Sequence, residues 1–416
     1  MRILIQIHTW SFRKPDASPA RAPQRLPGAV PGLPPPEVIE LCTGTIPADA
    51  PGFAMGAPVM LRLTRYRHPG HAKPPVLLIH GYSASGTSFA HPALPCSLAQ
   101  HLCDEGRDVW IVDLRSSAGM PTASYPWSFE QIGFADIPLA AEHIVKATGA
   151  AKIDIVAHCM GSAMLWMALL GDTASAHSKQ LPHDTAPDAR KALPGRIRKL
   201  VMSQIGPAMV MAPENIFRAY LMRYVQQFLP LTDYSFQTAE GAGVVNTLLD
   251  RVLSTLPYPT GEFQLENPFW PPGKRTSWVG TRHRMDALYG RVFKLANMPE
   301  AVLEHLNDFF GPLNIQTVSQ VIHFTRNRCI TDRTGFNRYV DPKRIADMKQ
   351  FPMLSLHGTE NGLANIATLA LLEAVLPKNM FTSKTIPSYG HQDCLLGRNA
   401  KADVFAPISS FFDVGD

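Results

Sequence analysis

The feature that most constrains the fold is a short apolar strand that runs directly into a tight turn and then into an apolar helix. Residues 153–157 (Ile-Asp-Ile-Val-Ala) have the length and composition of a buried strand, and residues 162–170 have those of a buried helix. Only His158–Gly161 lies between them. This unit is typical of a parallel sheet covered by helices, because parallel strands need a crossover connection.

Short apolar runs and amphipathic stretches alternate along most of the chain. The alternation predicts an open α/β fold whose mostly parallel sheet is covered by helices on both faces, with ligands bound beyond the carboxyl ends of the strands. Further strands are expected at 60–66, 76–79, 109–113, 199–203, 352–356 and 381–386, and further helices at 95–104, 129–148, 366–375 and 403–412.

The alternation stops between residues 207 and 349, where helical pieces and aromatic loops follow one another. Residues 216–224 carry apolar side chains at helix-face spacing, and residues 267–272 (Asn-Pro-Phe-Trp-Pro-Pro) form an aromatic loop. Packing between helices would account for most of these side chains. As a group they predict an apolar cap over a site.

We therefore expect one catalytic core that carries a large insertion, an arrangement compatible with the length of 416 residues. The expected parts are a Pro-rich flexible N-terminal segment (1–40), the first part of the core (41–206), a mainly helical cap insertion (207–349) and the second part of the core (350–416).

Composition argues against several classes of function. The net charge is only +5 and the Lys and Arg residues are scattered, so no nucleic-acid partner is expected. The 6 cysteines lie far apart, without the spacing of a zinc site or a disulfide scaffold. The apolar stretch at 3–7 is too short for a signal peptide, and no run is long enough to span a membrane. A soluble cytoplasmic protein is expected, with its oligomeric state open.

The turn at 158–161 has the layout of a nucleophile elbow, in which a strained backbone lifts one side chain above the start of a helix. The usual pattern is G-x-S-x-G; here His158 replaces the first Gly and Cys159 replaces the Ser, while Gly161 and Ser162 keep the far side small. We expect Cys159 to be the nucleophile, with its thiolate favoured by the helix N-terminus and a neighbouring His. The alternative is a small buried residue at a strand end.

A second motif, His80-Gly81-Tyr82, follows the expected strand 76–79. A turn in this position supplies one backbone N–H of an oxyanion hole, and the residue after the nucleophile supplies the other. The expected donors are therefore the N–H groups of Tyr82 and Met160.

A third motif, residues 386–394, follows the last expected strand and contains His391 on a Gly-containing loop. Such a loop can bring an imidazole over the elbow, so His391 is the expected general base. Its orienting partner is expected after the strand 352–356, where Glu360 and Asn361 are adjacent. Both stay open, with a slight preference for Glu360.

With these motifs the chain resembles the α/β-hydrolase domain fused behind cholesterol-oxidase-like (GMC) flavin oxidoreductases and, more distantly, acid lipases. The matching stretches, within residues 40–415, are 158–162, 201–205, 357–361 and 386–400. The resemblance implies an α/β-hydrolase fold, an acyl hydrolase and a functional association with an oxidoreductase. No strand precedes a G-x-G-x-x-G motif, so no flavin is expected, and no other cofactor is implied.

Together these observations predict an esterase, lipase or thioesterase that forms a covalent acyl-enzyme on Cys159 and acts on a lipophilic small-molecule acyl substrate without a metal. A Cys at the elbow also resembles polyhydroxyalkanoate synthases and dienelactone hydrolases, which leaves the acyl acceptor open. The alternatives are an acyltransferase of the same fold and a non-catalytic binding module that retains the fold.

Overall fold

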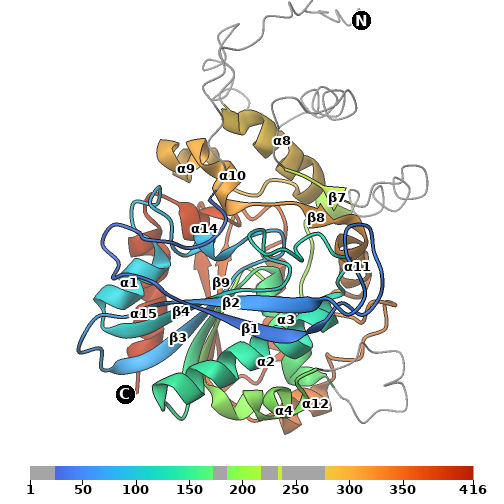
Figure 1. Cartoon of the computed structure of the whole chain (residues 1–416), viewed down its shortest axis with the longest axis horizontal. Helices are drawn as coiled ribbons and strands as arrows, with labels where there is room; N and C mark the ends of the chain where they lie inside the picture. Colours follow the sequence, from blue (N-terminus) through green and yellow to red (C-terminus); the bar gives the residue numbers. More distant parts are fainter. Residues whose placement is uncertain (1–23, 172–184, 217–232, 237–276, 416) are drawn as a thin grey trace, which may run out of the picture.

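A computed structural model describes residues 24–171, 185–216, 233–236 and 277–415, and a sheet of eight strands forms its centre (Figure 1). These strands are β1 (Glu37–Thr45), β2 (Pro58–Tyr66), β3 (Lys73–Ile79), β4 (Arg107–Asp113), β5 (Ile153–His158), β6 (Ile197–Ser203), β9 (Met353–Gly358) and β10 (Phe381–Ile386). Their order is β1-β2-β4-β3-β5-β6-β9-β10. β2 pairs antiparallel with β1 and β4, and all later neighbours pair in parallel. The mostly parallel sheet expected from the sequence is confirmed.

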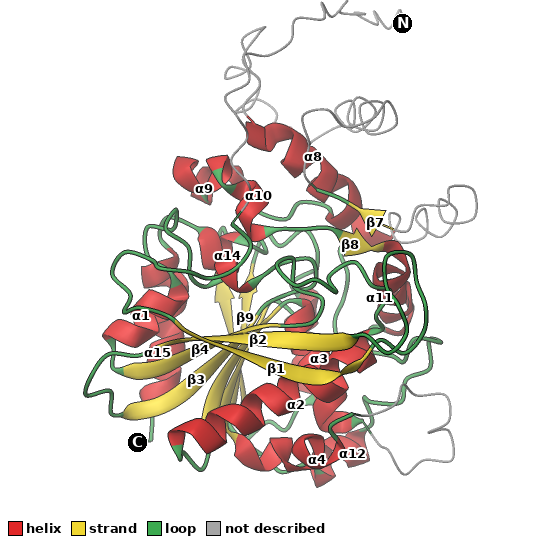
Figure 2. Cartoon of the chain, viewed as in Figure 1, coloured by secondary structure: helices red, strands yellow, loops and turns green. Residues whose placement is uncertain are grey.

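Helices cover both faces of the sheet (Figure 2). α2, α3 and α4 pack against one another, whereas α1 packs on β4 and against the turn that leads into α15. These helices are α1 (Leu98–Asp104), α2 (Phe129–Thr148), α3 (Met160–Leu170), α4 (Pro187–Arg196), α12 (Pro342–Asp347), α13 (Ala367–Val375), α14 (Asp393–Leu396), the π-turn η4 (Lys401–Phe405) and α15 (Ala406–Asp413); a short 3₁₀ turn, η1, covers Gly86–Ser88.

Several elements begin at residues that the apolar pattern does not mark. α1 starts at Leu98 because the side chain of Ser97 accepts from Gln100 N and caps the helix, so the preceding residues stay outside it. β4 starts two charged residues early, at Arg107 and Asp108, because both side chains are buried in ion pairs. Paired charges extend a buried strand where hydropathy predicts a loop.

The strongest of these charge networks surrounds Asp154 on β5. Arg107 and Arg198 both donate to its carboxylate, at 2.8 Å and 2.6 Å, and Arg107 also bonds Asp413 of α15 at 2.6 Å. The side chains of Arg107 and Asp154 are completely buried. The network therefore ties three strands of the sheet, β4, β5 and β6, to the last helix.

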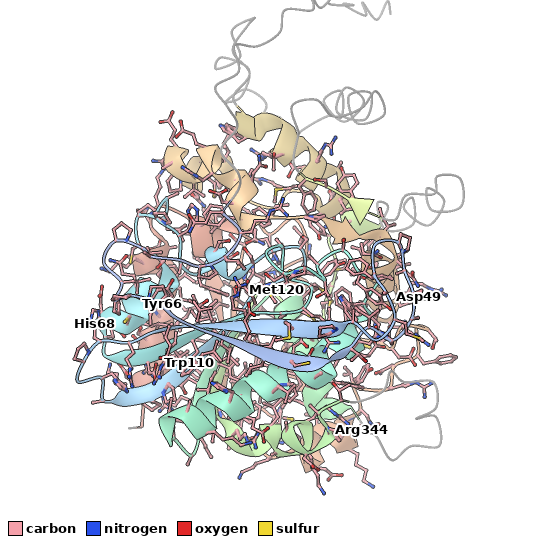
Figure 3. The ribbon with its side chains drawn as sticks, in the orientation of Figure 1. Asp49, Tyr66, His68, Trp110, Met120 and Arg344 are labelled. Atoms are coloured by element: carbon pink, nitrogen blue, oxygen red, sulfur yellow. The ribbon has the colours of Figure 1, made fainter. Side chains whose placement is uncertain are left out.

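The described part of the N-terminal segment differs from the expected flexible lead-in. β1 already begins at Glu37, and the residues before it contact the core. The hydroxyl of Tyr66, labelled in Figure 3, donates to Gly28 O at 2.6 Å, and Arg25 donates to Ala118 O at 3.3 Å. These contacts hold residues from Gln24 onward against the core.

The segment inserted between β6 and β9 is helical in most of its described residues. Most of the expected helix 216–224 and all of the aromatic loop 267–272 lie outside the described residues. The described elements are β7 (Asp233–Tyr234), α8 (Ser277–Tyr289), η3 (Leu295–Asn297), α9 (Glu300–Glu304), α10 (Leu306–Phe309), β8 (Leu313–Asn314) and α11 (Ile315–Asn327). The helices α8, α9 and α10 of this segment lie at one end of the view and α12 at the opposite end (Figure 1).

Among the described helices, none combines the length and the apolar character that crossing a membrane requires.

Candidate active site

The turn between β5 and α3 holds Cys159 in a strained conformation. Its backbone has φ 53° and ψ −132°, a region that side-chain-bearing residues rarely adopt. Its N–H donates to Ser203 O at 2.9 Å, and its C=O accepts from Ser162 N at 2.9 Å, so both sides of the turn are fixed. This conformation is the one the elbow motif predicts.

Two glycines permit this geometry. A Cβ on Gly161 would lie 2.4 Å from His80 O and 3.0 Å from Ile79 O, and a Cβ on Gly81 would lie 2.9 Å from the Cβ of Cys159. Larger residues at either position would separate the elbow from the turn after β3. The two small residues thus bring the candidate nucleophile and the candidate oxyanion turn into contact.

The electrostatic surroundings of the Cys159 thiol differ from those expected from the sequence. Burial raises its pKa from 9.0 to about 12, and the hydrogen bond from the backbone N–H of Met160 offsets only part of this effect. The prediction of a favoured thiolate is therefore wrong for this state of the protein. The position at a helix N-terminus is local, whereas the apolar surroundings come from tertiary packing.

The structure places the two expected oxyanion donors beside Cys159. Tyr82 and Met160 line the same pocket as the thiol. The Tyr82 hydroxyl is anchored away from the elbow, since Asn314 N donates to it at 3.0 Å and its ring packs edge-on against Phe129 at 5.3 Å. The backbone of this turn is therefore held by the inserted segment.

His391 lies on the loop between β10 and α14, and its backbone N–H donates to Val292 O at 3.0 Å. Its side chain is fully buried, with its ring centroid 4.9 Å from that of His158. Neither ring nitrogen has a hydrogen-bond partner among the described residues. Burial and the neighbouring His158 and His357 lower the pKa of His391 well below 6.5. His391 is therefore neutral and keeps a lone pair that can accept a proton.

Glu360 faces two cations. Its carboxylate accepts from Lys294 Nζ at 2.7 Å and forms an ion pair with Arg291 at 3.2 Å. Its side chain is 31% exposed, in contrast to the buried imidazole of His391. The structure shows no hydrogen bond between these two side chains within the described residues.

Asn361 is buried and fixed on both sides of its amide. Its Oδ1 accepts from the backbone N–H groups of Leu363 and Ala364 at 2.9 Å and 3.1 Å, and its Nδ2 donates to Gln204 Oε1 at 2.9 Å. It also has no hydrogen bond to His391 among the described residues. Asn361 is therefore buried, whereas the side chain of Glu360 is partly exposed.

The loop that carries His391 is held in part by Asp393. Its Oδ2 accepts from Gly390 N at 3.0 Å and from Asn297 Nδ2 at 2.6 Å, whereas its buried Oδ1 has no partner among the described residues. Burial raises the pKa of this carboxyl from 3.8 to about 6.

A predominantly apolar pocket opens above Cys159, between the core and the inserted segment. Sequence motifs did not indicate that two of its polar members, Ser83 and Tyr289, lie together, because the two are far apart in the chain. The lining residues are Tyr82, Ser83, Cys159, Met160, Met211, Asn215, Met285, Leu288, Tyr289, Val292, Phe310, Ile315, Val318, Ser319, Val321, Ile322, Leu363 and Gln392.

A separate cluster has side chains of the kind that bind metals. His91 Nε2 and His305 Nδ1 lie 3.2 Å and 2.8 Å from Asp308 Oδ2. However, Ala93 N donates to His91 Nδ1 at 3.1 Å, so Nε2 carries the proton of a neutral ring and lacks the lone pair that a metal needs. The arrangement fits two histidines that donate to one carboxylate.

Comparisons with known proteins agree with the fold. The family model described as "alpha/beta hydrolase fold" matches residues 74–240. Triacylglycerol lipase 1 of Arabidopsis thaliana is 23% identical over 82% of this chain and 79% of its own length. Lipase 1 of Drosophila melanogaster is 32% identical over 24% of this chain, and the match spans only 25% of that protein. Human gastric triacylglycerol lipase is 27% identical over 36% of this chain and 42% of its own length.

Among solved structures, a soluble variant of monoglyceride lipase from Saccharomyces cerevisiae superimposes with a TM-score of 0.50 at 14% identity. The superposition covers 85% of this chain and 91% of that protein. The elbow, the sheet order, the matching family model and this superposition lead to one conclusion: the chain has the α/β-hydrolase fold.

Proposed function

We propose that the protein is an acyl hydrolase that cleaves lipophilic esters through a covalent acyl-enzyme on Cys159. The observation that carries the proposal is the strained backbone of Cys159, which holds a thiol in a mainly apolar pocket at the start of a helix. Strain of this kind persists only where the surrounding structure maintains it, and it clusters at functional sites.

The pKa values favour a neutral thiol and a neutral imidazole before reaction. His391 then takes the thiol proton as the sulfur attacks the substrate carbonyl, and the new C–S bond forms as the carbonyl electron pair moves to oxygen. The N–H groups of Tyr82 and Met160 bind this oxyanion. The imidazolium gives its proton to the departing alcohol as the C–O bond breaks.

The second half of the reaction uses the same base. His391 takes a proton from water, the resulting hydroxide attacks the thioester, and the acid is released as the proton returns to the sulfur of Cys159. No net proton or electron is consumed. An activated thioester substrate would follow the same steps with a thiol as leaving group.

We propose that Asn361, ahead of Glu360, holds His391 in place indirectly, because its amide donates to Gln204, which in turn donates to Cys394 beside the loop that carries His391. The carboxylate of Glu360 already binds Lys294 and Arg291, whereas Asn361 is buried on the core side. An amide is sufficient here, because a Cys–His pair needs orientation more than a buried countercharge.

A lipophilic substrate is supported by the lining of the pocket, in which apolar side chains predominate. Relatives of the chain carry the names triacylglycerol lipase and, in Saccharomyces cerevisiae, sterol esterase 2. The substrate class proposed is therefore an ester with a long acyl chain or a bulky apolar alcohol.

The test is turnover of p-nitrophenyl esters and acyl thioesters of graded chain length by the wild type, Cys159→Ala and Cys159→Ser. We expect activity that increases with chain length and falls at least about a thousandfold in Cys159→Ala. Cys42→Ala, which removes an exposed cysteine on β1, is the matched control and should retain full activity. Turnover that survives in Cys159→Ala would exclude the proposed nucleophile.

A further inference from the structure

Two hydroxyl groups meet in the predominantly apolar pocket above Cys159. Ser83 Oγ lies 2.9 Å from the hydroxyl oxygen of Tyr289, and both residues line the pocket that contains the thiol. Ser83 directly follows Tyr82 in the turn after β3, and Tyr289 ends α8 of the inserted segment. The pair therefore joins the candidate oxyanion turn to the segment that covers it.

Both residues are held firmly in place. Ser83 has a left-handed backbone with φ 60°, and its C=O accepts from Gly311 N at 2.9 Å. The C=O of Tyr289 accepts from Asn215 Nδ2 at 2.5 Å, and its ring packs against Phe236 at 5.5 Å. The positions of the two hydroxyls are thus set by the fold before any substrate binds.

The Ser83–Tyr289 pair has one more O–H group than its mutual hydrogen bond uses. Two hydroxyls carry two hydrogens, and their mutual hydrogen bond uses one. Neither hydroxyl makes another hydrogen bond among the described residues, so one O–H remains to donate into the pocket. A buried donor without a partner costs about 1–3 kcal/mol, so this position favours an acceptor atom of a ligand.

The Tyr289 hydroxyl stays protonated, and Tyr289 lines the same pocket as Cys159. Burial raises its pKa well above 10.0, and the hydrogen bond with Ser83 offsets only part of this effect. A neutral phenol in the pocket of the reacting sulfur is a suitable donor to charge that develops during attack.

We propose that the Ser83–Tyr289 hydroxyl pair donates a third hydrogen bond to the oxyanion, in addition to the backbone N–H groups of Tyr82 and Met160. This inference rests on the proposed acyl transfer at Cys159. The pair transfers no proton: as the C–S bond forms, the O–H shortens its contact with the negative oxygen, and it relaxes when the carbonyl reforms.

The test uses Tyr289→Phe, Ser83→Gly and the combined variant. Glycine is chosen at position 83 because it adopts φ 60° without strain, so the backbone of the turn is retained. In a single variant the remaining hydroxyl can still donate, so the loss depends on which group faces the substrate. The combined variant leaves no donor, and its kcat should fall about 100- to 1000-fold with KM changed less than about threefold.

Tyr125→Phe is the matched control, because it removes a phenol hydroxyl that donates to Ala48 O at 3.1 Å, outside the pocket. It should leave kcat unchanged. A combined variant with wild-type kcat, or with a higher KM alone, would overturn the role in the oxyanion hole. Thermal unfolding of every variant shows whether a loss of activity comes from a folding defect. The single Tyr289→Phe variant is available if the combined variant does not fold. Full activity of Cys159→Ala would instead overturn the proposed function itself, so the two failures are distinguishable.

Discussion

Alkylation of Cys159 as a function of pH tests the electrostatic description of the site. Burial raises the pKa of this thiol from 9.0 to about 12. Each pKa unit changes the thiolate fraction tenfold, so at pH 7 about one molecule in 10⁵ carries the thiolate, about a thousandfold less than for a thiol with a pKa of 9.0. Because the thiolate is the reactive species, its alkylation at neutral pH should be slowed to a similar extent.

The assay is reaction with iodoacetamide between pH 7 and 9.5, followed by peptide mapping by mass spectrometry. Cys42 is exposed and serves as an internal reference in the same sample. The rate constant at Cys159 should rise about tenfold per pH unit throughout this range, without a plateau. Cys42→Ala would confirm that the signals of the two peptides are independent.

A plateau below pH 8, or alkylation of Cys159 at pH 7 as fast as that of Cys42, would refute this reasoning. Either result would mean that the thiolate is already stabilised by an imidazolium, in which case His391 would have to be protonated before substrate binds. A neutral thiol gives a rate that rises throughout the pH range, whereas a thiolate paired with an imidazolium gives a plateau. A single pH series therefore separates the two protonation states.

Three further predictions concern stability and are measured by denaturant unfolding. Gly161→Ala should lower the unfolding free energy by at least about 2 kcal/mol, since its Cβ would lie 2.4 Å from a backbone oxygen, whereas Gly195→Ala in α4 should not, since its Cβ would meet only Lys349 Nζ, at 3.8 Å. Asp154→Ala should cost about 3–5 kcal/mol because it removes the buried carboxylate that Arg107 and Arg198 share, while Glu40→Ala, at an exposed ion pair, should cost less than about 1 kcal/mol. Because the pKa of Asp393 is raised to about 6, the neutral carboxyl contributes its full share of the unfolding free energy below pH 4, and this contribution is lost as the pH rises through about 6. Asp393→Asn stays neutral, so its unfolding free energy should exceed that of the wild type by up to about 3 kcal/mol at pH 8 and should equal it at pH 4. These expectations would be contradicted if Gly195→Ala lost as much unfolding free energy as Gly161→Ala, or if Asp154→Ala and Glu40→Ala lost equal amounts. An effect of Asp393→Asn that does not change with pH would also contradict them.

The elbow could be predicted from the sequence because its determinants are local. A run of apolar β-branched residues, a turn with small residues and an apolar helix are adjacent at 153–170, and the observed β5 and α3 begin within two residues of the expected positions. The same holds for β10, whose bounds match the expected 381–386. Local pattern and local strain are sufficient for such elements.

β1 was not predicted because its apolar residues neither form a continuous run nor alternate strictly with polar ones. Only Thr43 among its residues is buried, which is typical of a strand at the edge of a sheet. β1 is a strand because it pairs with β2, and its composition alone does not indicate this.

The surroundings of the candidate site residues depend on tertiary packing and could not be predicted. His158, His357 and His391 come from three separate parts of the chain, yet the fold places the first two where they help to lower the pKa of His391. Glu360 is next to Asn361 in sequence, but the structure turns one toward two cations and buries the other. Spacing along the chain identifies the residues, whereas burial decides their protonation.

The most direct test of the central claim is the intact mass of the protein, quenched in acid during turnover of a p-nitrophenyl ester with a long acyl chain. We predict a mass increase equal to one acyl group, mapped to the peptide that contains Cys159 and absent in Cys159→Ala, which has no sulfur at the elbow. Continued ester turnover in Cys159→Ala, or an acyl group attached to another residue, would contradict the account.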